Sequence, residues 1–141
     1  MVKPFRSSCL IASALDLIGD KWSLLIVRDM LLYQKTTFKQ LSTSDEGVAT
    51  NLLSNRLKML ETLGIITKQK LPNNKKENIY LLTNKGIDLA PLILEIVLWS
   101  DKHVRAHHAS MNPYDERDLE RSVVIDSTQM AYREFVGQVL S

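Results

Sequence analysis

Four polar residues share one side of a predicted helix near the middle of the chain: Asn51, Ser54, Asn55 and Lys58. At 100° per residue from Leu53 they fall between about 100° and 200°, opposite the leucines of the same segment. Amide side chains can pair with adenine edges, Ser is a permissive partner, and Lys binds guanine or phosphate. The pattern suits the major groove of DNA, but any solvated helix has a polar face. The neighbouring elements must therefore distinguish a DNA-binding face from an ordinary solvated one.

A basic β-hairpin is predicted directly after this helix. The β-prone runs are Ile65–Leu71 and Glu77–Leu82, joined by a tip that holds Asn73, Asn74, Lys75 and Lys76. Lys68 and Lys70 alternate along the first strand, which places both on one face. Paired lysines on a protruding loop gain affinity for phosphates or the minor groove through counterion release. A plain soluble turn is the alternative interpretation.

The elements that must position these residues are predicted from apolar spacing and capping residues. In chain order they are a first helix capped by Ser7 or Ser8 and ended by Gly19, a second from about Asp20 to Tyr33, a short third capped by Thr36 or Thr37, a polar turn over 42–47, and a helix over 49–63 stopped by Gly64. Helix, helix, turn, helix and basic hairpin is the order of a winged helix-turn-helix. The fold class is therefore mainly α with a small β-hairpin.

Two further helical segments follow the hairpin. One is capped by Thr83 and runs to about Arg105, with Pro91 kinking it unless this proline lies in its first turns. The other lies in 111–141, as one helix or as two that meet near Ser127. Both carry more apolar surface than a small core can cover, which is typical of an interface. We expect a DNA-binding domain over 1–110 and a dimerisation extension over 111–141, unless the tail packs back on its own domain.

Charge and composition restrict the setting. Residues 21–85 hold 11 Lys and Arg against 5 Asp and Glu, whereas residues 111–141 hold 3 against 6. A basic middle and an acidic end fit a polyanion-binding module with another task at its end. The single cysteine excludes an internal disulfide and favours a reducing, cytoplasmic setting. Charged residues interrupt every apolar stretch before it reaches membrane-spanning length.

The chain resembles the HxlR-type branch of the MarR-like winged-helix transcription regulators over roughly residues 9–103. The matching residues are Cys9, Ala14, Leu15, Ile18, Gly19, Lys21, Trp22, Leu24, Leu25, Ile26, Arg28, Phe38, Leu41, Leu53, Ser54, Arg56, Leu57, Leu60, Glu61, Gly64, Ile66, Tyr80, Leu82, Thr83, Gly86, Leu89, Pro91 and Trp99. Two departures are Leu10, where the family usually has proline, and Ala49, where it usually has serine. Thr50 is then an alternative helix cap.

The resemblance implies a homodimeric repressor or activator, joined through its first and post-hairpin helices, that often acts beside its own gene. Two-fold symmetry predicts an inverted-repeat operator in double-stranded DNA. The expected recognition-helix contacts are Thr50, Asn51, Ser54, Asn55 and Lys58. The expected flank and wing contacts are Lys39, Arg56, Lys68, Lys70, Asn74, Lys75 and Lys76.

Cys9 is a candidate sensor of oxidants or electrophiles. It is predicted at the start of the first helix, where the helix dipole stabilises a thiolate, and Arg6 lies three residues before it. The resemblance implies the same role, because some family members sense through an early cysteine. With one thiol, only a bridge between subunits or a mixed adduct is open to it. The alternative is a small buried hydrophobic residue.

No constellation for an enzyme is found. The chain has no Gly-x-Ser-x-Gly elbow and no phosphate-binding glycine loop. His103, His107 and His108 lack a nearby Cys or Glu that would complete a metal site, so neither a metal nor a cofactor is expected. The competing functional hypothesis is a winged-helix protein-interaction module without sequence-specific DNA binding.

Overall fold

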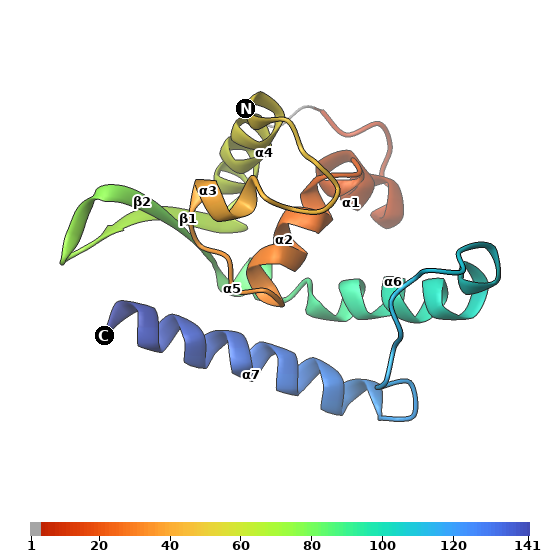
Figure 1. The fold of residues 1–141 in the computed structure, drawn as a ribbon. Coiled ribbons are helices and arrows are strands. Elements are labelled where there is room, and N and C mark those ends of the chain that lie inside the picture. The colour runs from red at the N-terminus through yellow and green to blue at the C-terminus, as the bar shows by residue number, and fades with distance from the viewer. Residues whose placement is uncertain (1–3) are drawn as a thin grey trace.

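The computed structural model describes residues 4–141 (Figure 1). The elements in chain order are α1 (Leu10–Ile18), α2 (Ser23–Leu31), α3 (Phe38–Leu41), α4 (Thr50–Thr62), β1 (Ile66–Leu71), β2 (Asn74–Leu82), α5 (Asn84–Ile87), α6 (Ala90–His103), the 3-10 turn η1 (Arg105–His107) and α7 (Arg121–Leu140). This order confirms the predicted winged helix-turn-helix. Over the same residues, no helix combines the length and the apolar character that a membrane crossing needs.

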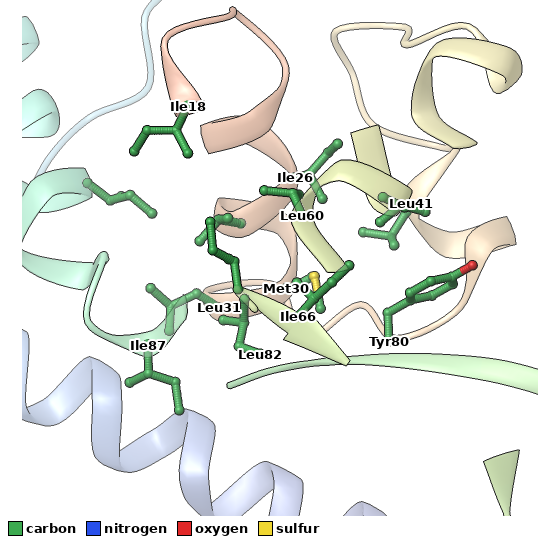
Figure 2. Close-up of a cluster of buried hydrophobic side chains, with 14 of the residues drawn as sticks. Ile18, Ile26, Met30, Leu31, Leu41, Leu60, Ile66, Tyr80, Leu82 and Ile87 are labelled. Atoms are coloured by element: carbon green, nitrogen blue, oxygen red, sulfur yellow. The ribbon is translucent and has the colours of Figure 1, made fainter. Parts of the chain in front are cut away.

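The core is built around α2, which contacts α3, β2, α6 and α7. Val27 and Met30 have no exposed surface, and Leu31 is buried beside them. Figure 2 shows side chains from α3, α4, both strands and α5 converging on this helix. Each large aliphatic side chain removed from water in this way contributes about 1.5–3 kcal/mol, so burial of the α2 face is what fixes the helices relative to one another.

The first helix differs from the prediction at its start and on its surface. Cys9 is the N-cap, and its Sγ accepts a hydrogen bond from the backbone N of Ala12 at 3.5 Å. Neither serine caps the helix, because the helix begins beyond both, and the Ser7 hydroxyl instead accepts from the Cys9 N–H. The apolar side of α1 stays open to solvent: Leu10 is 89% exposed and Ile11 72%. Of that side, Ile18 at the end of the helix is the residue that the described chain buries in its core.

The helix predicted after the hairpin is two helices. Thr83 caps the short α5 as expected, its Oγ1 accepting from the N–H of Gly86, but α5 ends at Ile87. Pro91 then lies in the first turn of α6. Proline has no N–H and clashes with the preceding turn of a helix interior, whereas the first turn tolerates it. The helix break before Pro91 therefore places this proline in a first turn, which is the alternative in which it does not kink a helix.

The tail forms one long helix, α7, which packs on its own domain (Figure 1). Tyr132 is fully buried, and its hydroxyl accepts a hydrogen bond from the backbone N of Leu82 at 2.8 Å. Gln129 donates to the carbonyl of Ile87, and Arg121 pairs with Glu95 of α6 at 2.6 Å. The tail thus closes the core beneath the end of β2.

Candidate nucleic-acid interface

Helix α4 is held to the core by one leucine row. Leu53, Leu57 and Leu60 are 0–2% exposed, as their shared side of the helix predicts. The helix ends in a Schellman motif: Gly64, at φ +74°, donates to Glu61, and the N–H of Ile65 donates to the carbonyl of Leu60. The buried row and the C-terminal motif therefore hold the helix in one orientation, and its opposite side is fixed with it.

The start of α4 corrects the expectation about its cap. Ala49 occupies the N-cap position, and no side chain of residues 4–141 caps the helix there. Thr50 is the first helical residue and lies exposed, so it is not the cap. The Asn51 side chain partly compensates, because its Oδ1 accepts the N–H of Leu52 at 2.9 Å. The helix thus begins where the family pattern places it, without the usual serine.

The outward side of α4 presents the predicted polar residues. Asn51, Asn55 and Lys58 are exposed, and Ser54 is half-buried between them. These four side chains form one wall of a groove of about 1040 Å³, and the other wall is α1 with the residues that flank it. The candidate recognition surface is therefore a helix face bordered by a groove.

Two carboxylates on the α1 side of this groove form ion pairs with arginines. Asp16 accepts from the backbone N of Arg6 and pairs with its guanidinium, and these contacts hold the pKa of Asp16 below its usual value. Burial alone would raise the pKa of Asp20, but hydrogen bonds from Ser23 and Trp22 and the nearby charge of Arg56 lower it. Both carboxylates are thus held ionised, each with a basic partner.

Arg56, which is expected to flank the DNA contact, pairs with Asp20 in the structure. Its Nε lies 3.2 Å from Oδ2 of Asp20, and its side chain is only 27% exposed. Its role in the described structure is to tie α4 to the turn between α1 and α2. Lys39, the other flanking residue, is exposed on α3, whose start is fixed by a capping box between Thr37 and Gln40.

The hairpin is the predicted wing, with a shorter loop. Only Pro72 and Asn73 lie between the strands, and Asn74 already belongs to β2. Lys70 pairs with Asn78, but the next residue, Leu71, pairs with Asn74. Residues 75–77 of β2 therefore have no partner in β1 and form a bulge. The lysine pair therefore projects from this bulge and not from the loop. The exposed basic residues of the wing are Lys68, Lys70, Lys75 and Lys76.

The wing is also fastened to the helix-turn-helix. The backbone N of Tyr80 in β2 donates to the carbonyl of Thr36, just before α3, at 2.7 Å. Lys85 of α5, which follows the wing, donates to the carbonyl of Leu63 at the C-terminal end of α4, at 2.6 Å. The wing lysines and the α4 face thus belong to one connected unit.

A buried charge cluster was not predicted from the sequence. Asp29 is 2% exposed on α2, whose other buried residues are Ser23 and four apolar ones. Its carboxylate pairs with Arg28 and Lys35, and Arg28 also binds Glu46, which precedes α4. We call these four residues the Asp29 cluster. The one signal in the sequence was an acidic residue within the apolar period of α2, where isolated carboxylates are rarely buried without partners.

Cys9 lies on the surface at the start of α1. The guanidinium of Arg6, three residues before Cys9 in the chain, pairs with Asp16. The alternative interpretation of Cys9 as a buried hydrophobic residue is therefore wrong.

An α4 face of amide, hydroxyl and ammonium groups beside a lysine-bearing wing defines a winged helix-turn-helix DNA-binding protein. A family model described as HxlR-like helix-turn-helix matches residues 17–108. The chain therefore belongs to the HxlR-like helix-turn-helix family, and it is a transcriptional regulator of the helix-turn-helix type.

Known proteins with similar sequences carry the same description. The HTH-type transcriptional regulator YodB of Bacillus subtilis is 33% identical over 90 residues, which cover 64% of this chain and 80% of YodB. An uncharacterised HTH-type regulator of Mycobacterium tuberculosis, MT3179, is 32% identical over 67% of this chain. The match spans only 58% of that relative.

Solved structures agree with the fold. The crystal structure of PA1607 is 36% identical with a TM-score of 0.68, covering 82% of this chain and 79% of that one. Reduced YodB of B. subtilis is 31% identical with a TM-score of 0.57, covering 69% and 95%. YodB has also been solved in quinone-bound and diamide-treated forms.

Proposed function

We propose that this protein is a sequence-specific regulator, a repressor, that binds an inverted-repeat operator as a homodimer. The observation that carries the proposal is the division of α4 into a buried leucine row and an exposed face of Asn51, Asn55 and Lys58. Such groups bond base edges in the major groove. The wing lysines would then hold the phosphate backbone or the minor groove. Action on chromosomal DNA would place the protein in the cytoplasm.

The homodimer is supported by apolar surface that the described chain itself leaves open. Leu10, Ile11 and Leu15 on α1 and Ile96 and Trp99 on α6 are all exposed. A second copy that covers these residues would bury the same patches on both chains. The recognition helices of such a dimer would then enter two half-sites of the operator separated by about one helical turn or a multiple of it.

The test is a titration against two duplexes in rising salt. One duplex carries the region upstream of the protein's own gene, and the other is random. We expect the upstream duplex to bind more tightly by a factor of about 10³ or more. Equal affinity for both duplexes at every salt concentration would contradict sequence-specific binding and would favour the protein-interaction module.

Regulation through Cys9 is the second part of the proposal. The thiol is exposed, and the quinone-bound and diamide-treated structures of YodB show that a related regulator has been studied with such reagents. Oxidation would join the Cys9 sulfurs of two subunits, with two electrons and two protons passing to the oxidant. An electrophile would instead form a covalent adduct with the thiolate.

The expected result is that diamide or a quinone weakens operator binding by the wild type and leaves the Cys9→Ser variant unaffected. Operator affinity before and after treatment measures this, with the mass of the protein under non-reducing conditions showing a bridge or an adduct. Affinity that is unchanged by either reagent in both proteins would exclude Cys9 as the sensor.

A further inference from the structure

The Asp29 cluster joins the core helix α2 to two segments, the one before α3 and the one before α4. We propose that Glu46, acting through Arg28 and Asp29, is a positioning residue that sets the entry of the recognition helix and so controls discrimination between operator and random DNA. The inference rests on the proposed function, because it assigns the means by which the α4 face is aimed.

The first arm of the cluster reaches the turn before α4. The guanidinium of Arg28 donates to Oε2 and Oε1 of Glu46 at 3.1 and 2.8 Å, which is a two-point contact. The same guanidinium donates twice to Oδ1 of Asp29, at 3.0 and 2.6 Å. A planar guanidinium held at four points has little freedom to rotate. Glu46 is therefore fixed relative to α2.

The three residues after Glu46 carry that fixed position into the recognition helix. Gly47 turns the chain with φ at +72°, Val48 is buried, and Ala49 is the N-cap of α4. Since no side chain of the described residues caps the helix at Ala49, the direction in which the chain enters α4 is set by the residues before it. The Arg28–Glu46 contact is the charged anchor of that entry.

The second arm reaches the segment before α3. Lys35 Nζ lies 3.4 Å from the other carboxylate oxygen of Asp29, and the Lys35 backbone N donates to the Asp29 carbonyl. The capping box of α3 begins two residues later at Thr37. One buried carboxylate thus supports the entries of both helices of the motif.

Because Glu46 is negatively charged, a positioning role and a purely electrostatic role predict opposite effects of its replacement on operator affinity. Glu46 is an acidic side chain, 37% exposed, in the turn that leads into the DNA-facing helix, and Arg28 lowers its pKa, so it stays ionised. Removing a negative charge near DNA should strengthen binding to every sequence. Mispositioning α4 should instead weaken only the contacts that depend on base edges. The two effects have opposite signs for the operator.

The experiment measures affinity for the operator and for random duplex with wild type and the Glu46→Gln variant. We expect the ratio of the two affinities to fall roughly tenfold, about the size of one good base contact, while random binding stays equal or becomes slightly tighter. Asp45→Asn is the matched control, because this exposed neighbour loses the same charge but forms no ion pair in the described structure. Its affinity ratio should not change.

A double-mutant cycle tests whether Glu46 acts through Arg28. In an Arg28→Lys background, which keeps the charge but loses the two-point contact, Glu46→Gln should lower the ratio by much less than tenfold. Urea unfolding of each variant shows that the ratio is measured on folded protein. A Glu46→Gln ratio equal to that of wild type overturns the positioning role alone. A wild type without any preference for the operator overturns the proposed function and this inference with it.

Discussion

At the scale of single residues, exposure separates side chains that are free to read bases from those that already have a partner. Asn55 and Lys58 are exposed without a side-chain hydrogen bond to the described part of the protein, whereas Asn51 accepts the N–H of Leu52. Arg56, although basic and on the same helix, is paired with Asp20. The polarity of a side chain in the sequence therefore indicates a candidate contact, and its local partners decide whether it is free to make one.

Asn55→Ala should relax base preference at one operator position by about 1–3 kcal/mol, because its amide can bond a base edge in pairs. It is a cleaner probe than Asn51, whose replacement would also remove the hydrogen bond at the start of α4. Affinities for a set of single-base operator variants measure the effect.

The matched comparison is replacement of Lys75 and Lys76 by alanine. Since these side chains lie on the wing, we expect the replacement to weaken binding to all sequences alike and to lower the salt slope by about one for each phosphate that is no longer bound. Equal losses of specific and random binding in the Asn55 variant would contradict its assignment to base reading.

At the scale of elements, the tail helix acts as a support for the wing. α7 buries Tyr132 beneath the end of β2, where the hydroxyl accepts the N–H of Leu82. That N–H lies at the end of the strand that carries Lys75 and Lys76, and next to Thr83, the cap of α5. One side chain of the tail thus stabilises the junction of the wing with the post-wing helices.

Tyr132→Phe should lower the free energy of unfolding by about 1–3 kcal/mol, because it leaves the buried N–H of Leu82 without an acceptor. Urea unfolding measures this, and the Leu82 amide should exchange with solvent faster. Tyr114→Phe is the control: its hydroxyl is buried without a hydrogen-bond partner in the described structure, so its loss should be close to neutral. Equal effects of the two substitutions would show that the hydrogen bond contributes nothing particular.

The elements that the sequence predicted well are those with local signals. The leucine period of α4, Gly64 after it, and the caps Thr37 and Thr83 all lie where their residue types indicate. The features that were missed depend on residues far apart in the chain. Arg28 and Glu46 are 18 residues apart, and neither periodicity nor capping preference reports such a pairing.

At the scale of the whole molecule, apolar surface is distributed unevenly. The core-facing sides of α2 and α4 are closed, while α1 exposes Leu10 and Ile11, α6 exposes Trp99, and the outer side of α7 exposes Met130. Burying a large aliphatic side chain is favourable by about 1.5–3 kcal/mol. A partner chain is therefore the expected cover for these residues, in line with the proposed dimer.

Ile11→Glu should shift the protein from dimer to monomer, since it places a charge within the apolar side of α1. Sedimentation measures the change, and operator affinity should fall with it because one subunit reaches only one half-site. Leu32→Glu is the control, because Leu32 is 44% exposed but lies outside α1 and α6. A dimer that survives Ile11→Glu unchanged would place the interface elsewhere.

The positions of Tyr132 and Leu82 in the chain also determine when their hydrogen bond can form during synthesis. The two residues are 50 positions apart, and the ribosome releases a chain from its N-terminal side first. The helix-turn-helix and the wing leave the ribosome before their last support has been translated. Until Tyr132 emerges, the nascent chain exposes the apolar surface that α7 later covers, and such surface attracts chaperones and promotes aggregation. Premature termination before Tyr132 would therefore leave that surface uncovered and the truncated chain prone to aggregation.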